Sequence, residues 1–470
     1  MTLIDQLKLI KEENLTSFHV PGHKGHPILM DYYKDIEQVL ALDLTEFPGT
    51  DDLHDPQTCI RFSQEQASSL YKSQSAYFLV NGTTCGIYSM IMAATQPGDC
   101  LLVQRDCHKA VYEALFLGRV KGYGVYPQVH ETGMSLGLSL ESVKQAFMEH
   151  PHAKGLVLTY PNYYGIACDI EAICDYAHSL GKLVLVDGAH GAHLQLNKSL
   201  PTCPLEAGCD IVVQSSHKSL PVMTQASILH VNSDRIDRIQ LERMLRLHQS
   251  SSPSYLLMSS LDIGLKIYAQ EGLMRMARLL EAIDGFMEAH GKSFLQDGDL
   301  PEGFTRDRTK MVYLGLKSQK DPEDLDQQLR KKGIQLEFSN PNLAVFVTSI
   351  MNEKEDFSDL LKKMENLDLK WYSGNENTGC KLDLPVVLSI SEAYYKPSHL
   401  VDLEASIGSL AKDYIIPYPP GVPLIIPGER INQELIDLIR VYIKSQQHIK
   451  GIYKSESTEF KIEIITEERE

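Results

Sequence analysis

Three polar groups that could act together in chemistry each follow a short apolar run of the sequence. Asp187 ends the run KLVLVD, and Lys218 lies shortly beyond the run DIVVQ. A third run, AYFLV, leads into the turn NGTTCG, which places Thr83 and Thr84 at the start of an expected helix. A buried carboxylate needs a cationic partner, and a lysine with a lowered pKa is a good nucleophile. Helix-start N–H groups and hydroxyls can together hold a phosphate.

Each of these signals also has an ordinary structural interpretation. A threonine at such a turn is usually a helix N-cap, an aspartate after a strand is often a cap, and a single lysine is usually solvated. The combination is more informative than its parts. A phosphate cradle, an acid and an amine match the phosphate, ring nitrogen and aldehyde of pyridoxal phosphate (PLP). We therefore predict PLP chemistry, in which the acid keeps the ring nitrogen protonated so that the ring can accept electrons.

Short apolar runs alternate with helix-like stretches across the region that carries these groups. Strands are expected at 76–80, 100–104, 155–159, 182–186 and 210–214, and a helix over about 57–73. Fully apolar strands that alternate with helices indicate a mostly parallel α/β sheet covered on both faces. Ligands bind such sheets at the carboxyl ends of the strands, where the polar groups lie.

A second, smaller α+β domain is predicted towards the C-terminus. The stretch 297–310 is typical of a linker; beyond it we expect strands at 310–316, 343–349 and 385–390 and a helix within 321–333. Prolines exclude a helix over 418–429. The predicted organisation is an N-terminal arm with active-site loops (1–60), the large α/β domain (61–295), the C-terminal domain (296–455) and an acidic tail or edge strand (456–470).

Composition excludes several classes of protein. With 43% hydrophobic and 23% charged residues, the 470-residue chain is globular rather than disordered. A net charge of −17 makes nucleic acid and anionic membranes poor partners. No apolar run approaches the ~18 to 20 residues of a membrane span, and no signal peptide is recognised at the N-terminus. Nine cysteines without metal-site spacing predict reduced thiols, no metal site and a soluble, cytoplasmic protein.

Several longer motifs occur along the chain: VPGHKG (20–25), LTEFPGTDDLHDP (44–56), FLVNGTT (78–84), RDCHKAV (105–111), VDGAHGAH (186–193), VQSSHKSLPVMTQ (213–225), SSSPSY (250–255) and YPPGVPLIIPG (418–428). In these motifs and their order the chain resembles the bacterial ornithine/lysine/arginine decarboxylases, PLP enzymes of fold type I, the aspartate-aminotransferase fold. The pair VQSSHK and VDGAHGAH is highly specific. The chain looks like the short form, without the extra N-terminal domain of larger relatives.

The resemblance implies a role for each matching residue. Lys218 would bond to the cofactor aldehyde, Asp187 would pair with the ring nitrogen, and His108 would stack on the ring. His190, where some relatives carry a tryptophan, would lie near the ring hydroxyl. The residues that would bind the phosphate are Thr83, Thr84, Ser215, His217 and, from the partner subunit of a homodimer that shares its sites, Ser252 in SSSPSY.

Acidic residues are expected to act outside the contacts with the cofactor. One of Glu46, Asp51 and Asp52 would attract a cationic substrate tail, although the alternative is a solvated acidic turn. Glu392 and Glu429 are candidates for acids behind the site, and 418–428 is expected to be a rigid scaffold beside it.

The implied reaction is PLP-dependent decarboxylation of a basic L-amino acid, arginine or lysine ahead of ornithine, to its amine and carbon dioxide. One alternative is another fold type I reaction, such as aminotransfer or retro-aldol cleavage, because the electron sink is shared. A second is a catalytically silent PLP-binding regulatory protein. The presence of Lys218, and the lack of a helix-turn-helix unit before the core, disfavour the second.

Overall fold

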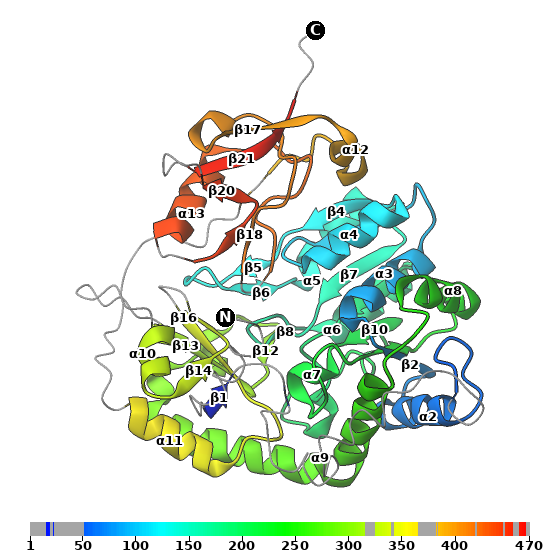
Figure 1. Ribbon diagram of the computed structural model, residues 1–470, viewed down its shortest axis with the longest axis vertical. Coiled ribbons are helices and arrows are strands. Elements are labelled where there is room, and N and C mark those ends of the chain that lie inside the picture. Colours follow the sequence, from blue (N-terminus) through cyan, green and yellow to red (C-terminus); the bar gives the residue numbers. More distant parts are fainter. Residues whose placement is uncertain are drawn as a thin grey trace.

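A seven-stranded, mostly parallel sheet forms the centre of the computed structural model (Figure 1). The structure describes residues 16–18, 22, 51–314, 325–339, 343–364, 382, 384–418, 421–444, 447–454 and 460–466. In spatial order the strands are β2 (Ser75–Leu79), β11 (Ser227–Val231), β10 (Ile211–Gln214), β9 (Leu183–Asp187), β7 (Gly155–Thr159), β3 (Cys100–Gln104) and β4 (Lys121–Val125). Within this sheet β11 runs in the direction opposite to that of the other six strands.

The five strands predicted for this region are confirmed, with ends that differ by at most one residue. The predicted helix over 57–73 is α2 (Cys59–Tyr71). Two strands of this seven-stranded sheet were missed. β4 contains two glycines among five residues and is largely exposed, and β11 reads SILHV with a buried histidine. Neither pattern is a fully apolar run.

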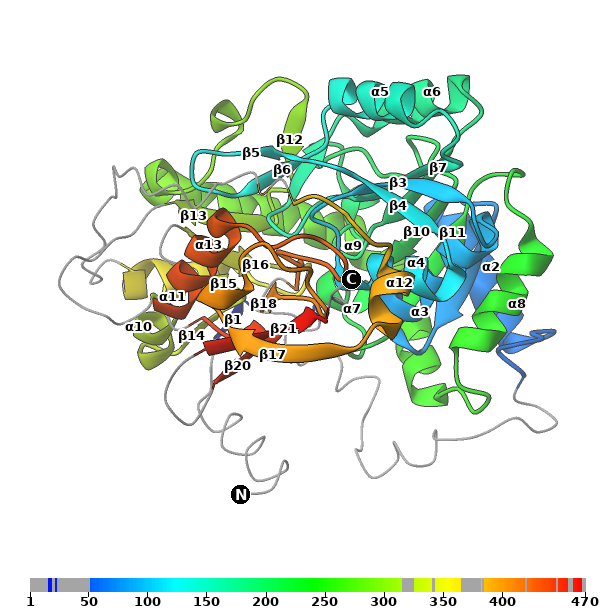
Figure 2. The ribbon, with the colours of Figure 1, turned by 90° about the horizontal axis from the view of Figure 1, so that it is seen from above.

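Alternate residues of the central strands enter two different cores. Val103, Leu185 and Val213 share one core with α3 (Gly82–Ala94), α4 (Lys109–Gly118) and α8 (Arg238–His248). Leu102, Val184 and Val212 enter the other core, with α5 (Leu140–Glu149), α6 (Ile170–Ser179) and α9 (Tyr255–His290). Figure 2 shows α5 and α6 on one side of the sheet and α3 and α8 on the other. Burying each such side chain contributes roughly 1.5–3 kcal/mol, which is why these strands are apolar on both faces.

A second, smaller sheet lies beside the long helix α9, at the lower left of Figure 1. It has the order β13 (Lys310–Leu314), β16 (Leu343–Val347) and β15 (Phe338–Ser339), and it is accompanied by α10 (Leu325–Lys331) and α11 (Lys354–Met364). β14 (Ile334–Leu336) pairs in parallel with β1 (Thr16–Phe18). One continuous core joins this region to the large sheet.

The linker predicted over 297–310 is wrong for its second half. β12 (Phe304–Arg306) pairs with β8 (Ile166–Cys168), and Asp307 and Lys310 are buried beside the large sheet. Charged residues are typical of linkers, but here tertiary contacts bury them.

The C-terminal region has a separate core and forms the top of Figure 1. Its sheet has the order β17 (Ser398–Asp402), β21 (Phe460–Ile465) and β20 (Ile452–Lys454), with α12 (Ile390–Tyr395) and α13 (Gln433–Lys444) nearby and the short pair β18 (Ile416–Pro417) and β19 (Ile449–Lys450). β21 comes from the segment predicted to be an acidic tail or edge strand, yet it lies between two strands because Ile462 and Ile464 are buried.

The strand predicted at 385–390 is wrong. Val386 makes only an isolated bridge to Glu429, Val386 and Val387 are exposed, and Ile390 already begins α12. The segment 418–429 contains no helix over its described residues, as the prolines predicted. Among the helices that the structure describes, none has the length and apolar content needed to cross a membrane.

Candidate active site

The polar groups singled out in the sequence meet at the carboxyl ends of the central strands. Asp187 is the last residue of β9, and Lys218 lies in the short helix α7 (Ser216–Ser219) after β10. Thr83 is in the first turn of α3, which follows β2. Because β11 reverses direction between β2 and β10, β2 runs the same way as β9 and β10. All three groups therefore lie at one edge of the sheet, as expected for ligand sites in this architecture.

The amine of Lys218 is held against an imidazole. Its Nζ lies 3.0 Å from Nε2 of His190, which is itself buried. Burial lowers the pKa of Lys218, although the charges of Asp187 and Glu337 partly oppose that effect. A lysine of this kind holds more of its amine in the neutral, nucleophilic form than a surface lysine does.

Asp187 presents a carboxylate with spare capacity to accept hydrogen bonds. Its Oδ1 accepts the N–H of Ala189 at 3.2 Å, and no described residue donates to Oδ2. Burial raises the pKa of Asp187, while the charge of Lys218 acts in the opposite direction. A protonated pyridine nitrogen would give this carboxylate the donor and the positive charge that it lacks, so Asp187 fits the ring nitrogen of PLP.

The start of α3 fits a phosphate. The Oγ atoms of Thr83 and Ser215 are 3.0 Å apart, and Gly82 turns the chain into the helix with φ of +74°. The first N–H groups of a helix have no partner within it, and Thr84 follows in the same turn. The buried hydroxyl of Ser216 has no described partner either. These donors, with Asp187 and Lys218, suit all three polar ends of PLP.

His217 contacts the main chain: its Nδ1 lies 3.2 Å from the carbonyl oxygen of Ala226.

His108, predicted to stack on the cofactor ring, lies at the amino end of α4. It is the N-cap of α4, and its Nδ1 accepts the N–H of Ala110 at 3.2 Å. Burial, followed by the charge of Lys218, lowers the pKa of His108 to about 4, so its imidazole is neutral. A Cβ added to Gly421 would lie 3.6 Å from the His108 ring, so the segment after β18 covers this histidine. This contact brings Gly421, within the segment 418–428, next to His108, and the role of that segment as a rigid scaffold stays a prediction.

Gly22, in the motif VPGHKG, supports the loop that carries Lys218. Its N–H donates to the carbonyl oxygen of His217, and Ser349 Oγ donates to the carbonyl oxygen of Gly22 at 2.5 Å. A Cβ at Gly22 would lie 2.7 Å from the main-chain oxygen of Leu220, closer than real contacts allow. A glycine at position 22 therefore allows two backbones to pack closely.

We expect Gly22→Ala to weaken PLP binding about 10-fold, because a backbone clash of roughly 1–3 kcal/mol would displace α7. The dissociation constant of PLP, followed by the visible absorbance of the bound cofactor, checks this. Gly285→Ala in α9 is the control, since a Cβ there meets nothing within 4 Å. Equal PLP affinity in the two variants would contradict the supporting role of Gly22.

Several predicted residues take other positions. Asp51 accepts main-chain N–H groups of Asp52, Gln57, Thr58 and Ile60, and its oxygens thereby fix the start of α2. The carboxylate of Glu392 caps α12 through Ser389 and is largely exposed. Glu46 lies outside the described residues.

Ser252 is on the exposed loop between α8 and α9. The loop begins at Ser250, whose N–H donates to Oδ1 of Asn81 at 3.4 Å. It thus lies next to the turn at Asn81 of its own chain, and the contact of Ser252 with a partner's phosphate stays a prediction.

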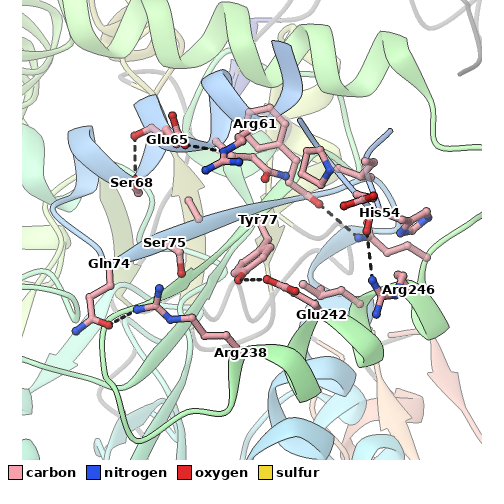
Figure 3. A pocket seen from close by; sticks show the side chains of 18 residues that line it. His54, Arg61, Glu65, Ser68, Gln74, Ser75, Tyr77, Arg238, Glu242 and Arg246 are labelled. Carbon is pink, nitrogen blue, oxygen red and sulfur yellow. Dashed lines mark hydrogen bonds and ion pairs between the residues drawn. The ribbon is translucent and has the colours of Figure 1, made fainter. Parts of the chain in front are cut away.

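A pocket of about 410 Å³ lies elsewhere, between α2, the amino end of β2 and α8 (Figure 3). Its acidic side chains have partners within the pocket: Glu65 pairs with Arg61 at 2.9 Å, and Glu242 accepts the hydroxyl of Tyr77 at 3.0 Å. None of the residues predicted to hold PLP lines this pocket. No group of three or more potential metal ligands gathers anywhere in the described part of the chain.

Three residues near Lys218 were missed by sequence reasoning. Tyr163 follows β7, and its ring meets that of His190 edge-on at 5.5 Å. Its hydroxyl donates to Oε1 of Glu337 at 3.1 Å. Lys310, at the start of β13, donates to the carbonyl oxygen of His190 at 3.4 Å. Tyr163 could have been found from its place after an apolar run, whereas Glu337 and Lys310 carry no such signal.

Comparisons with known proteins agree with this geometry. The family model for the Orn/Lys/Arg decarboxylase major domain matches residues 2–298, and that for the family's C-terminal domain matches residues 387–457. An uncharacterized protein of Bacillus subtilis, YaaO, is 36% identical over 94% of both chains. The arginine decarboxylase of the same organism is 30% identical over 96% of this chain and 95% of its own.

Among solved structures, the lysine decarboxylase LdcF of Francisella novicida superimposes with a TM-score of 0.77 at 19% identity, over 94% of this chain and 76% of its own. That likeness confirms the predicted PLP fold type I, with a mostly parallel sheet and a smaller C-terminal domain. The residues at the strand ends suit PLP, the family's cofactor. From its fold and from the family models that match most of its length, the chain belongs to the Orn/Lys/Arg decarboxylase family.

Proposed function

We propose that this decarboxylase converts L-arginine or L-lysine to the corresponding amine and carbon dioxide. The observation that carries the proposal is the buried amine of Lys218, placed beside His190 and at the strand end next to Asp187. The relative of B. subtilis named arginine decarboxylase favours arginine. Lysine is kept as a second candidate substrate because the family description includes lysine, and ornithine is the third candidate.

PLP, when bound, supplies a ring that accepts the electron pair left by the departing carboxylate. The chain's own residues would bind that ring and keep its nitrogen protonated. Asp187 would keep the ring nitrogen protonated, and the neutral imidazole of His108 would stack on one face. Thr83, Thr84, Ser215 and His217 would anchor the phosphate, and Lys218 would hold the aldehyde carbon and later regain its free amine.

Glu337 is proposed to bind the positively charged tail of the substrate. Burial lowers the pKa of Lys218 and of Lys310, and the charge of Glu337 acts in the opposite direction on both, so its carboxylate lies close to the two amines. Tyr163 stays protonated, because burial and the nearby Glu337 raise the pKa of its phenol, and its hydroxyl orients that carboxylate. A half-buried acid held in this way attracts an ammonium or guanidinium group more strongly than a fully solvated one.

We expect Glu337→Gln to raise KM for the basic substrate by about 10- to 100-fold, since a charge-assisted hydrogen bond contributes roughly 1.5–3 kcal/mol. The kcat should change much less, because the tail interaction is the same in substrate and transition state. Initial rates over a range of substrate concentrations measure both constants. Glu404→Gln, which removes an exposed acid paired with Arg440, is the control. An unchanged KM in Glu337→Gln would rule out the tail site.

The active enzyme is proposed to be a homodimer in the cytoplasm. In fold type I the site lies at a subunit interface, which would bring Ser252 of one chain to the phosphate of the other. None of the eight cysteines in the described part of the chain forms a disulfide, which suits a reducing compartment. Molecular mass in solution, measured by light scattering with and without PLP, tests the dimer.

The deciding experiment is an amine assay with arginine, lysine and ornithine. Purified protein with PLP is compared with Lys218→Ala under the same conditions. Formation of one amine, absent in the variant, would support both the reaction and the substrate. If none of the three substrates releases amine or carbon dioxide while PLP remains bound to Lys218, the proposed substrates are wrong.

A further inference from the structure

A buried polar cluster lies at the turn between β12 and β13, close to His190. It consists of His193, Asp307, Thr309 and Lys310, each at most 3% exposed. Oγ1 of Thr309 donates to Oδ1 of Asp307 at 2.7 Å, and Nε2 of His193 lies 3.0 Å from Oδ2 of Asp307. Nζ of Lys310 is 3.9 Å from the same Oδ2. Buried charges are retained at such a density only where they partner one another.

The position of the cluster is fixed by main-chain contacts with the large domain as well as by the contacts among its own side chains. The N–H of Asp307 donates to the carbonyl oxygen of Gly165 at 2.7 Å, and β12 pairs with β8. Burial would raise the pKa of Asp307, but its contacts with His193 and Lys310 hold that pKa well below its usual range. Asp307 therefore stays ionised and holds Lys310 in place.

Lys310 connects this cluster to the reactive lysine. Its Nζ donates to the main-chain oxygen of His190 at 3.4 Å, and Nε2 of the same histidine lies 3.0 Å from Nζ of Lys218. An ammonium can only donate, so Nε2 of His190 must accept when Lys218 is charged. The ring proton then sits on Nδ1, a buried atom with no described partner.

We propose that Lys310 is a positioning residue for the reaction: from the β12–β13 turn it holds the main chain of His190, and through that imidazole it orients the Nζ of Lys218. This inference rests on the role proposed above for Lys218.

The charge of Lys310 adds an electrostatic effect to the positional one. The groups that face His190 are Lys218 and His217 from α7, His193 from its own loop, Tyr163 after β7, and Lys310 from the β12–β13 turn. Asp307 lies behind Lys310, as its ion-pair partner. Burial, followed by the charges of Lys218 and Lys310, lowers the pKa of His190 well below its usual range. His190 is thus a neutral acceptor. A positive Lys310 also disfavours protonation of any nitrogen on Lys218.

The test is a spectrophotometric pH titration of the lysine-bound cofactor in the holoenzyme. Loss of a nearby positive charge stabilises the protonated chromophore, so Lys310→Met should raise the titration midpoint by on the order of one pH unit. The effect should hold below about pH 8, because burial lowers the pKa of Lys310 to about 8 and the charge is lost above it. Lys310→Arg should restore a midpoint close to that of the wild type.

Lys412→Met is the matched control, because Lys412 also donates to main-chain oxygens, those of Tyr394 and Lys396, but lies in the C-terminal region. Thermal unfolding reports whether each variant is folded. If Lys310→Met does not fold, Lys310→Gln gives the same test, since it keeps an N–H donor without the charge. A midpoint unchanged from that of Lys412→Met would overturn the role of Lys310.

Failure of the proposed role of Lys218 would look different. In that case the wild-type protein would show no cofactor band that disappears in Lys218→Ala, whatever residue stood at position 310.

Discussion

Lys218→Ala is expected to reduce kcat/KM for the basic amino acid by at least about 10³-fold, the usual scale for loss of a covalent catalyst that acts with its neighbours. Alanine cannot form the covalent bond to the cofactor, and Nε2 of His190 loses its partner at 3.0 Å. PLP should still bind, more weakly, because Thr83, Ser215 and Asp187 are untouched.

Amine release gives the activity, and the absorbance spectrum separates covalent from non-covalent PLP. Lys198→Ala is the control, since Lys198 is exposed and outside the predicted site. Activity within about 10-fold of the wild type in Lys218→Ala, a difference of only about 1.4 kcal/mol in the barrier, would show that another amine carries the reaction.

Arg105→Met is expected to lower the free energy of unfolding by about 3–5 kcal/mol, the range for breaking a buried ion pair. The guanidinium group of Arg105 lies 2.8 Å from Oε2 of Glu429 and donates to the carbonyl oxygens of Pro423 and Leu424 at 3.0 and 3.1 Å. The side chain of Glu429 is only 1% exposed, so methionine would leave its charge without a cationic partner and with the N–H of Ile426, at 2.9 Å, as its remaining donor. Burial already raises the pKa of Glu429, and the charge of Arg105, followed by the N–H of Ile426, opposes this effect.

Urea denaturation compares Arg105→Met with Arg440→Met. Arg440 pairs with Glu404 on the surface, where side-chain exposures are 44% and 56%, and exposed pairs contribute only about 0–1 kcal/mol. Equal denaturation midpoints for the two variants would show that the buried pair does not hold the C-terminal region to the loop of His108.

A residue's position could be predicted from the sequence where it follows from adjacent residues, and could not where it depends on a distant partner. Asp187 and Lys218 follow runs such as LVLV and IVVQ, whose burial on both faces of a sheet makes them strands, so their place at the strand ends could be inferred. Glu429 was suspected as an acid behind the site, but its partner, Arg105, could not be inferred because the two are 324 positions apart.

The misses have the same cause. Lys310 and Asp307 belong to a charged stretch that looks like a linker, and only the pairing of β12 with β8 buries them. Val386 and Val387 have strong strand propensity, yet no neighbouring strand covers them and they remain exposed. Tertiary contacts therefore decided both cases: they bury a charged stretch in one, and their absence leaves two valines outside a strand in the other.

The contacts of Gly22 have a consequence for the order in which the protein is completed during synthesis. Gly22 supports the loop of Lys218 but is itself hydrogen-bonded by Ser349, 327 positions later in the chain. In the same way, β1 can pair only after β14 has been synthesised. The large sheet can form as soon as β11 has emerged from the ribosome, yet the reactive amine does not acquire its final surroundings until residue 349 has followed. Contacts this distant in sequence form late in folding. A nascent chain truncated before that point would therefore contain the sheet without a finished catalytic centre.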